Sequence, residues 1–392
     1  MSNIIQKIRQ QFFEKAQPLK PGLYNFQAGP ENEFPYRLHL RIENDGEGIL
    51  IINASTVLHL NRTAAEFAYH LVNETPRPDV IESIIKRYDI PVLDASNDFD
   101  SFVEKIETLI HTPDLDPISY LDFERQDPYS DIPVAPYRLD CALTYKLYIP
   151  DESSVAPVDR VKRELTEEEW KTILDKAWQA GIPHVVFTGG EPTLRPDLIN
   201  LIKYAESLGQ VTGVVTDGAR LAEKDYLHEI LYAGLDHLFI TLDVENNQTW
   251  EALRDVLPED IHVTVHITVT EENYDQMNDV LERLQHLEVN NLSFSTNEVE
   301  MKAKTQELAK LAGEMGLDLI WDVSVPYSNL NPVAFETQSD PRRSYGAGSA
   351  WLYVEPDGDV LPGQGINTVL GNFLEDDWDS IWQNSKDNLP KA

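Results

Sequence analysis

The chain has 392 residues, 42% of them hydrophobic, so it is long enough for about two or three domains with sizeable cores. Its 67 acidic residues outnumber 32 basic ones and give a formal net charge of −35, which repels nucleic-acid phosphates and anionic lipid. Its apolar runs are far shorter than the roughly 20 residues of a membrane helix, and its start has no signal-peptide core. We therefore expect a cytoplasmic protein with neither nucleic acid nor membrane as a partner.

The single cysteine, Cys141, restricts the chemistry further. One thiol cannot form an internal disulfide, and no cysteine-rich zinc or iron–sulfur site can be built from this chain alone.

The N-terminal third predicts a small mixed domain. Residues 1–20 are expected to form an amphipathic helix or a loose arm. The segment Arg37–Ile42 alternates with period two, Asn44–Gly48 contains a turn, and Ile49–Ile52 pairs back as a hairpin. Helical spacing then predicts three helices, at residues 64–71, 78–88 and 99–111.

The hairpin, the sequence Leu60-Asn-Arg-Thr-Ala-Ala65 and the helices after it resemble the PqqD-like winged-helix family. This resemblance implies that the domain binds a peptide, because the family binds leader peptides of ribosomally made natural products. A generic winged helix is the alternative, and the acidic charge disfavours its DNA-binding version.

A proline-rich linker separates this domain from an alternation of strands and helices. Strands are predicted at residues 138–144, 184–188, 211–216, 237–243, 262–269 and 291–295, with one more at 318–322, and helices at 166–180, 196–208, 222–233, 249–256, 273–286 and 302–315. Repeated strand–helix units predict an α/β protein with a parallel sheet, here a partial (β/α)6 barrel resembling a TIM barrel. We divide the sequence into an arm (1–20), a winged-helix-like domain (21–115), a linker (116–134), a partial barrel (135–325) and a C-terminal extension (326–392).

One strand of this barrel ends in a distinctive turn. The apolar run from Val185 to Phe187 stops at Gly189 and Gly190, and Glu191 and Pro192 follow. Ligands of parallel sheets bind at such carboxyl ends, and glycine allows close backbone approach.

The segment Thr188-Gly-Gly-Glu-Pro-Thr193 resembles the signature turn of radical S-adenosylmethionine (SAM) enzymes. The resemblance implies a (β/α)6 barrel whose turn holds the methionyl amine of SAM. The candidate cofactor-binding residues are Gly189, Gly190, Glu191, Pro192, Thr216, Asp217, Gly218, Thr241 and Asp243. The alternative, which we prefer, is that Glu191 and Asp243 are structural capping acids.

The segment from Trp351 to Pro362 predicts a hairpin around Pro-Asp-Gly, and it resembles the SPASM or twitch extension of peptide-modifying radical SAM enzymes. We interpret Pro356–Asp359 as the hairpin turn, since the other ligands of an EF-hand calcium loop are lacking. His262 and His266 share one strand face about 13 Å apart, which favours buried barrel histidines over metal ligands.

The resemblance also implies cluster ligands, which this sequence lacks. Radical SAM chemistry needs a [4Fe–4S] cluster on three thiolates, and the family spacing places them at Leu147, Asp151 and Ser154. A second register, Cys141 with Tyr145 and Tyr148, destroys the Leu-Thr-Tyr match and is rejected. The positions where the extension carries cysteines hold Ser328, Ser344 or Tyr345, and Gly363.

We therefore expect no iron–sulfur cluster and no metal, assign no catalytic residue, and leave SAM as the one cofactor that the pocket could still hold. The sequence is interpreted as a degenerate radical SAM protein, a pseudoenzyme that binds a peptide or partners a cluster-bearing homologue. Two alternatives stay open. One is an enzyme that uses SAM or another small ligand at the barrel mouth without a cluster, with Glu191, Asp217 and Asp243 as acid–base groups. The other is a scaffold that binds no small molecule.

Overall fold

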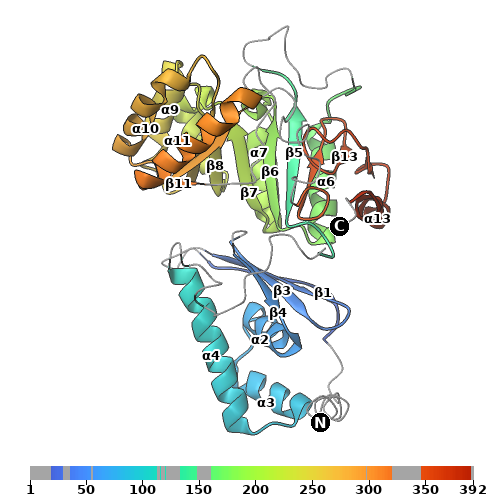
Figure 1. Ribbon diagram of the computed structural model, residues 1–392. Coiled ribbons are helices and arrows are strands. Elements are labelled where there is room, and N and C mark those ends of the chain that lie inside the picture. Colours follow the sequence, from blue (N-terminus) through green and yellow to red (C-terminus); the bar gives the residue numbers. More distant parts are fainter. Residues whose placement is uncertain are drawn as a thin grey trace. The chain divides into compact units, whose positions relative to one another are not determined.

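The computed structural model describes residues 19–29, 36–53, 56–112, 115, 120, 133–147, 160–296, 298–319 and 346–389. The chain divides into two compact units, Met1–Asp127 and Pro128–Ala392 (Figure 1). Among the described helices, none is both long enough and apolar enough to cross a membrane.

The first unit is a four-stranded antiparallel sheet with three helices. Its strands lie in the order β1 (Gly22–Gln27), β2 (Arg37–Ile42), β3 (Gly48–Ile52) and β4 (Thr56–Leu60), and the helices are α2 (Arg62–Val72), α3 (Arg77–Tyr88) and α4 (Val92–His111). The predicted hairpin is confirmed, with Leu40 opposite Leu50. Asn61 caps α2, because its side-chain oxygen accepts a hydrogen bond from the Ala64 amide at 3.0 Å.

One boundary in this unit was predicted wrongly. Helix α4 begins at Val92, seven residues before the predicted start at Phe99. The polar residues Asp94, Ser96, Asn97 and Asp98 hid the helical pattern. Ala95 and Phe99, one turn apart, are both buried in a cluster with Val80 and Ile84 of α3, so packing against α3 extends the helix.

The second unit contains a ten-stranded sheet within the described residues. Its parallel part runs in the order β11 (Asp318–Leu319), β10 (Asn291–Ser295), β9 (His262–Thr268), β8 (His237–Thr241), β7 (Val211–Thr216), β6 (His184–Gly189) and β5 (Arg138–Thr144). The helices between the strands are α6 (Glu167–Ala180), α7 (Leu198–Leu208), α8 (Lys224–Leu231), α9 (Asn247–Val256), α10 (Met277–His286) and α11 (Lys302–Glu314). The predicted α/β class with a parallel sheet is confirmed.

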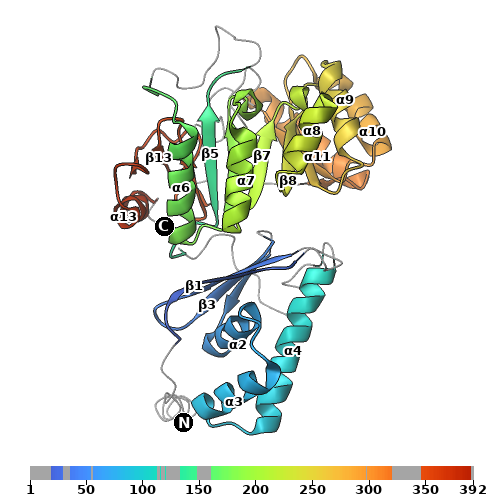
Figure 2. The ribbon, with the colours of Figure 1, turned by 180° about the vertical axis from the view of Figure 1, so that it is seen from behind.

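These helices cover one face of the sheet, as Figure 2 shows for α6 and α7 in front of β5 and β7. The first of them begins at a capping box. The Thr166 side chain accepts from the Glu169 amide, and the Glu169 carboxylate accepts from the Thr166 amide. Trp170, which is fully buried, then joins the apolar side chains of the strands in one large core.

The C-terminal segment continues the same sheet. It contributes β12 (Trp351–Val354), β13 (Asp359–Leu361), β14 (Gly371–Asn372) and helix α13 (Trp378–Asn388). The predicted hairpin around Pro-Asp-Gly is confirmed as the antiparallel pair β12–β13. Strand β12 also runs parallel to β5, with Leu352 beside Leu139, so the hairpin extends the barrel sheet at its β5 edge.

Candidate functional site

The turn after β6 contacts the backbone that leaves β5. The Gly190 amide donates to the Thr144 carbonyl at 2.7 Å, and the Glu191 amide donates to the Lys146 carbonyl at 2.8 Å. A Cβ atom at Gly189, where φ is 134°, would lie 2.0 Å from the Thr144 oxygen. A Cβ at Gly190 would lie 2.3 Å from the Lys146 oxygen. The two glycines are therefore required by the approach of two strand ends.

Glu191 lies at the centre of the turn and is 1% exposed. Its Oε1 accepts hydrogen bonds from the Thr193 amide (2.9 Å), the Thr193 hydroxyl (2.5 Å) and the Thr216 hydroxyl (2.9 Å). Its Oε2 accepts from the Asp217 amide at 2.8 Å. The carboxylate thus caps the short helix Pro192–Leu194 and joins the ends of β6 and β7.

At this end of the sheet, neighbouring carboxylates raise the pKa of Glu191 and of Asp217. Burial, and then the nearby Asp217 carboxylate, raise the pKa of Glu191 well above its ordinary value. Burial also raises the pKa of Asp217, and the Asp243 carboxylate adds to that rise. The hydrogen bonds that Glu191 accepts act in the opposite direction but do not outweigh burial. A cation placed among these carboxylates would therefore be stabilised.

The remaining predicted residues support the same strand ends. The Thr241 hydroxyl donates to the Thr216 carbonyl at 3.2 Å, and the Gly218 amide donates to the Thr216 hydroxyl at 3.1 Å. Asp243 is exposed, and its Oδ1 accepts from the Glu245 amide at 3.1 Å. The structure thus brings Glu191, Thr216 and Asp217 into direct contact, and Thr241 and Asp243 lie on the neighbouring strand end.

Cys141 does not lie at this mouth. It is fully buried in β5, in the core on the helix-covered side with Leu139, Leu143 and Phe187. Burial raises the pKa of its thiol well above the ordinary value, which disfavours the thiolate that iron requires. Tyr145 donates its hydroxyl to Glu355 at 2.8 Å, and Leu147 carries no ligand atom. Asp151 and Ser154 lie outside the described residues.

A family cluster of the [4Fe–4S] type therefore does not fit the residues of this chain. Three thiolates are required, and the sequence offers one buried thiol. Of the predicted positions in the extension, Gly363 is described and has no side chain, whereas Ser328, Ser344 and Tyr345 lie outside the described residues.

The carboxylates of Glu164 and Glu355 bind residues on either side of residues 148–159. We call these two residues the carboxylate clamp. Glu164 accepts from the Thr144 hydroxyl (2.6 Å) and from Lys146 Nζ (3.0 Å). Glu355, which is fully buried, accepts from Tyr145 and from Arg160 Nε (2.8 Å) and Nη2 (2.5 Å). The clamp therefore fixes the exit of β5 to the segment before α6 and to the β12–β13 hairpin.

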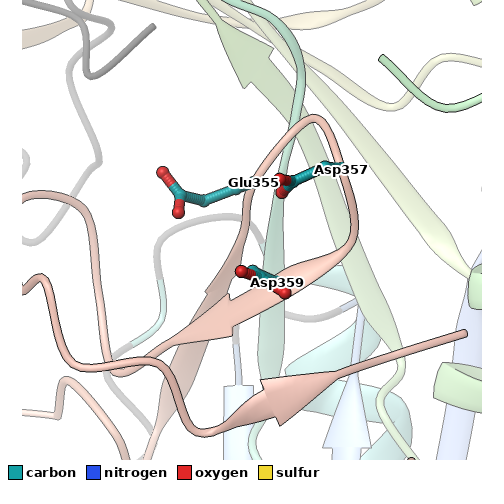
Figure 3. Close-up of side chains that lie close together, drawn as sticks. All are labelled: Glu355, Asp357 and Asp359. Atoms are coloured by element: carbon teal, nitrogen blue, oxygen red, sulfur yellow. The ribbon is translucent and has the colours of Figure 1, made fainter. Parts of the chain in front are cut away.

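The hairpin also carries three acids whose ligand atoms lie within 4.8 Å of one another: Glu355, Asp357 and Asp359 (Figure 3). Arg160 already pairs with Glu355, and Asn372 donates to Asp359 at 2.9 Å. These contacts agree with a structural turn, as predicted for Pro356–Asp359.

Sequence reasoning missed the clamp and the partners of the barrel histidine His266. Its Nδ1 lies 3.1 Å from the Ser293 hydroxyl, and its Nε2 lies 3.0 Å from the Ser295 hydroxyl. Burial lowers the pKa of His266 to about 3, so it is neutral. The prediction of buried barrel histidines is confirmed for His266 and is wrong for His262, which is exposed at the start of β9. The alternating pattern from His262 to Thr268 predicted the face of the strand on which His266 lies. It could not predict the partners of His266, because Ser293 and Ser295 lie 27 and 29 residues further along the chain.

A model of the radical SAM superfamily matches residues 141–284 of this chain, which include the turn at Glu191. This segment of the chain is similar to the radical SAM superfamily. Among curated proteins, it is 27% identical to a PqqA peptide cyclase of Bradyrhizobium diazoefficiens over 274 residues, covering 61% of this chain and 70% of the relative. It is also 27% identical to a PqqA peptide cyclase of Streptomyces rochei over 282 residues, covering 64% and 77%.

Solved structures of Streptococcus suis SuiB share the fold of this chain. SuiB bound to S-adenosylmethionine matches with a TM-score of 0.56 and 15% identity, covering 91% of this chain and 88% of SuiB. SuiB bound to its precursor peptide SuiA matches with a TM-score of 0.54 and 15% identity, covering 86% and 84%. Each SuiB match covers more residues of this chain than the second unit contains. The likeness therefore extends into both units.

Proposed function

We propose that this chain is a peptide-binding member of the radical SAM superfamily that works without an iron–sulfur cluster of its own. The observation that carries the proposal is the place of Cys141, which is the only thiol and is buried in the core on the helix side of β5. In support, Leu147 offers no ligand atom at the first predicted cluster position, and the carboxylate clamp joins the segments on either side of residues 148–159.

Two comparisons support the peptide as a partner. The matching cyclases are named for a peptide, PqqA, and SuiB has been solved with its precursor peptide. The net charge of −35 favours a basic peptide over an acidic one. The four-stranded unit is the proposed binding domain, from its PqqD-like sequence.

The absence of a cluster is tested by anaerobic purification and reconstitution with iron and sulfide, followed by quantification of both elements. We expect no stoichiometric sulfide. About four irons and four sulfides per chain, as a [4Fe–4S] cluster contains, would overturn the proposal.

A gain-of-ligand variant provides the matched control. Leu147→Cys, Asp151→Cys and Ser154→Cys together restore the family spacing, and this triple variant should acquire iron and sulfide under the same reconstitution. The comparison separates a missing ligand set from a barrel that cannot be reconstituted at all.

If a short precursor peptide is encoded beside the gene, that peptide, labelled for fluorescence anisotropy, tests peptide binding. A cluster-bearing radical SAM homologue from the same neighbourhood should co-elute with the chain in gel filtration if the two act as partners. Absence of both interactions would leave the scaffold alternative.

A second candidate function is non-radical use of SAM at the barrel mouth, with Glu191, Asp217 and Asp243 as the acid–base groups. The raised pKa values of Glu191 and Asp217 favour it, because a sulfonium or ammonium group would relieve the repulsion between the carboxylates. Titration calorimetry with SAM tests it, and Asp217→Asn should weaken any binding observed. A flat titration would remove this candidate.

A further inference from the structure

Strand β1 is one of the two outer strands of the sheet in the first unit. Within the described residues it pairs with β2 alone, in a register without a break from Gly22 opposite Ile42 to Gln27 opposite Arg37. Its sequence, Gly-Leu-Tyr-Asn-Phe-Gln, contains no charged residue and no proline. Lysine, proline and bulges are the usual devices that keep an edge strand from pairing with another chain, so β1 lacks this protection.

The hydrogen bonds of the sheet determine which groups of β1 point outward. The Ala28 amide donates to the Tyr36 carbonyl at 2.8 Å, and bonded pairs recur at every second residue of an antiparallel ladder. Tyr24 therefore bonds to β2, whereas Leu23 and Asn25 direct their N–H and C=O groups away from the sheet. In the part of the chain that the structure describes, these outward groups have no hydrogen-bond partner.

The side chains along this edge leave it accessible. Tyr24 lies on the side of α2, where its ring meets the ring of Tyr69 edge-on, with the centroids 4.8 Å apart. Leu23, which is 44% exposed, and Asn25, which is also exposed, lie on the other side of the strand. A further strand would therefore reach the outward backbone groups of both residues.

We propose that β1 is a self-association edge, at which two copies of this chain pair antiparallel about a two-fold axis at Tyr24. Leu23 of one copy then lies opposite Asn25 of the other as a hydrogen-bonded pair, and the outward groups of both residues are satisfied in both copies. The two Tyr24 residues face each other as a non-hydrogen-bonded pair, in which side chains are closest and aromatic contacts stabilise the ladder.

The charges around β1 favour a second copy over the basic peptide proposed above. Lys20 precedes the strand, and its ladder partner β2 carries Arg37 and Arg41, so a basic peptide would lie beside cations. Two uncharged β1 strands bring no like charges directly opposite each other. The two Lys20 residues would lie about 27 Å apart along the paired strands, beyond the roughly 10 Å screening length at 0.1 M salt.

The test is sedimentation equilibrium of the full chain over a concentration series that reaches the millimolar range. We expect the mean mass to rise with concentration from that of one chain towards that of two. It should rise further with NaCl, because salt screens the repulsion between two chains of charge −35. A mass that stays that of one chain, or an association that weakens in salt, would overturn the proposal.

Asn25→Pro distinguishes this edge from any other contact surface. Proline removes the outward N–H but leaves the bonds of Tyr24 to β2 in place, so association should weaken by about tenfold or more. Asn25→Thr keeps the N–H and should associate like the wild type. Val57→Pro is the matched control on the opposite edge, because its N–H also points outward in the register of β4 with β3. Equal association constants for the two proline variants would contradict the proposal.

Tyr24→Cys tests the register, and it remains informative if circular dichroism shows that a proline variant is unfolded. Cβ atoms of a directly opposed pair lie about 4.5–5.5 Å apart, so mild oxidation should link two variant chains by a disulfide after a small shift. The native Cys141 is fully buried and should not react. Tyr232→Cys, at a side chain that is 88% exposed, controls for random collisions, and equal linking of both variants would count against the interface.

The labelled peptide separates the two possible occupants of this edge. If the wild type stays monomeric and Asn25→Pro loses peptide binding that Val57→Pro retains, β1 binds the peptide and the self-association proposal is wrong. Peptide binding that Asn25→Pro leaves unchanged, together with its loss of dimer, supports self-association at β1.

Discussion

At the scale of single residues, the turn at Gly189 and Gly190 has a structural role that does not depend on a bound cofactor. Both glycines face backbone oxygens of the β5 exit, so the protein itself requires them. Glu191 likewise caps a short helix and holds two strands. These three residues therefore stabilise the fold whether or not a cofactor is bound.

Gly190→Ala should lower the free energy of unfolding by about 1–3 kcal/mol or more, because the new methyl group meets the Lys146 carbonyl at 2.3 Å. Gly313→Ala on α11 is the control, since its Cβ would meet nothing within 4 Å and alanine favours a helix by about 0.5–1 kcal/mol. Denaturant unfolding of the two variants should therefore give shifts of opposite sign.

Glu191 also predicts a pH dependence. Its pKa is raised by folding, so its contribution is fully present below the unfolded pKa of about 4.3 and is lost as pH rises through the folded pKa. The Glu191→Gln variant should therefore lose less unfolding free energy than the wild type between mildly acidic and mildly alkaline pH. Equal slopes in the two proteins would contradict the raised pKa.

His266 predicts the opposite slope. Folding lowers its pKa to about 3, so its contribution is present above the unfolded pKa of about 6.5 and is lost as pH falls. Unfolding free energy should decline on acidification below about pH 6.5 and less steeply in His266→Gln. NMR titration of the imidazole, which should stay neutral in the folded protein at pH 5, checks the same shift directly.

At the scale of elements, the sequence predicted most strands and helices of the second unit because buried parallel strands are continuous apolar runs. Val185 to Phe187 is an example. The sequence did not predict that β12 pairs with β5, since no local pattern connects Leu352 to Leu139. The clamp escaped prediction for the same reason, because Glu355 lies 195 residues from Arg160 and 210 from Tyr145.

The clamp is expected to contribute strongly to the attachment of the hairpin. Arg160→Leu leaves the fully buried Glu355 without its cation, and such a loss typically costs about 3–5 kcal/mol of unfolding free energy. Glu314→Gln, which removes an exposed partner 3.7 Å from Lys310, should have no measurable effect. Hydrogen exchange in β12 and β13 should accelerate only in the first variant.

At the scale of the whole molecule, the charge of −35 opposes compactness through self-repulsion. Added salt shortens the screening length from about 10 Å at 0.1 M to about 3 Å at 1 M. The thermal unfolding midpoint should therefore rise as NaCl is added. An unchanged or lower midpoint would show that local ion pairs outweigh the net charge.

The pairing of β12 with β5 covers what would otherwise be an exposed edge strand of the sheet. With β12 in place, the outward-facing amides and carbonyls of β5 are satisfied. A chain shortened before residue 346 would present them to solvent as a ready template for another strand. Such truncated chains should self-associate, so the segment from residue 346 onward also protects the protein against aggregation.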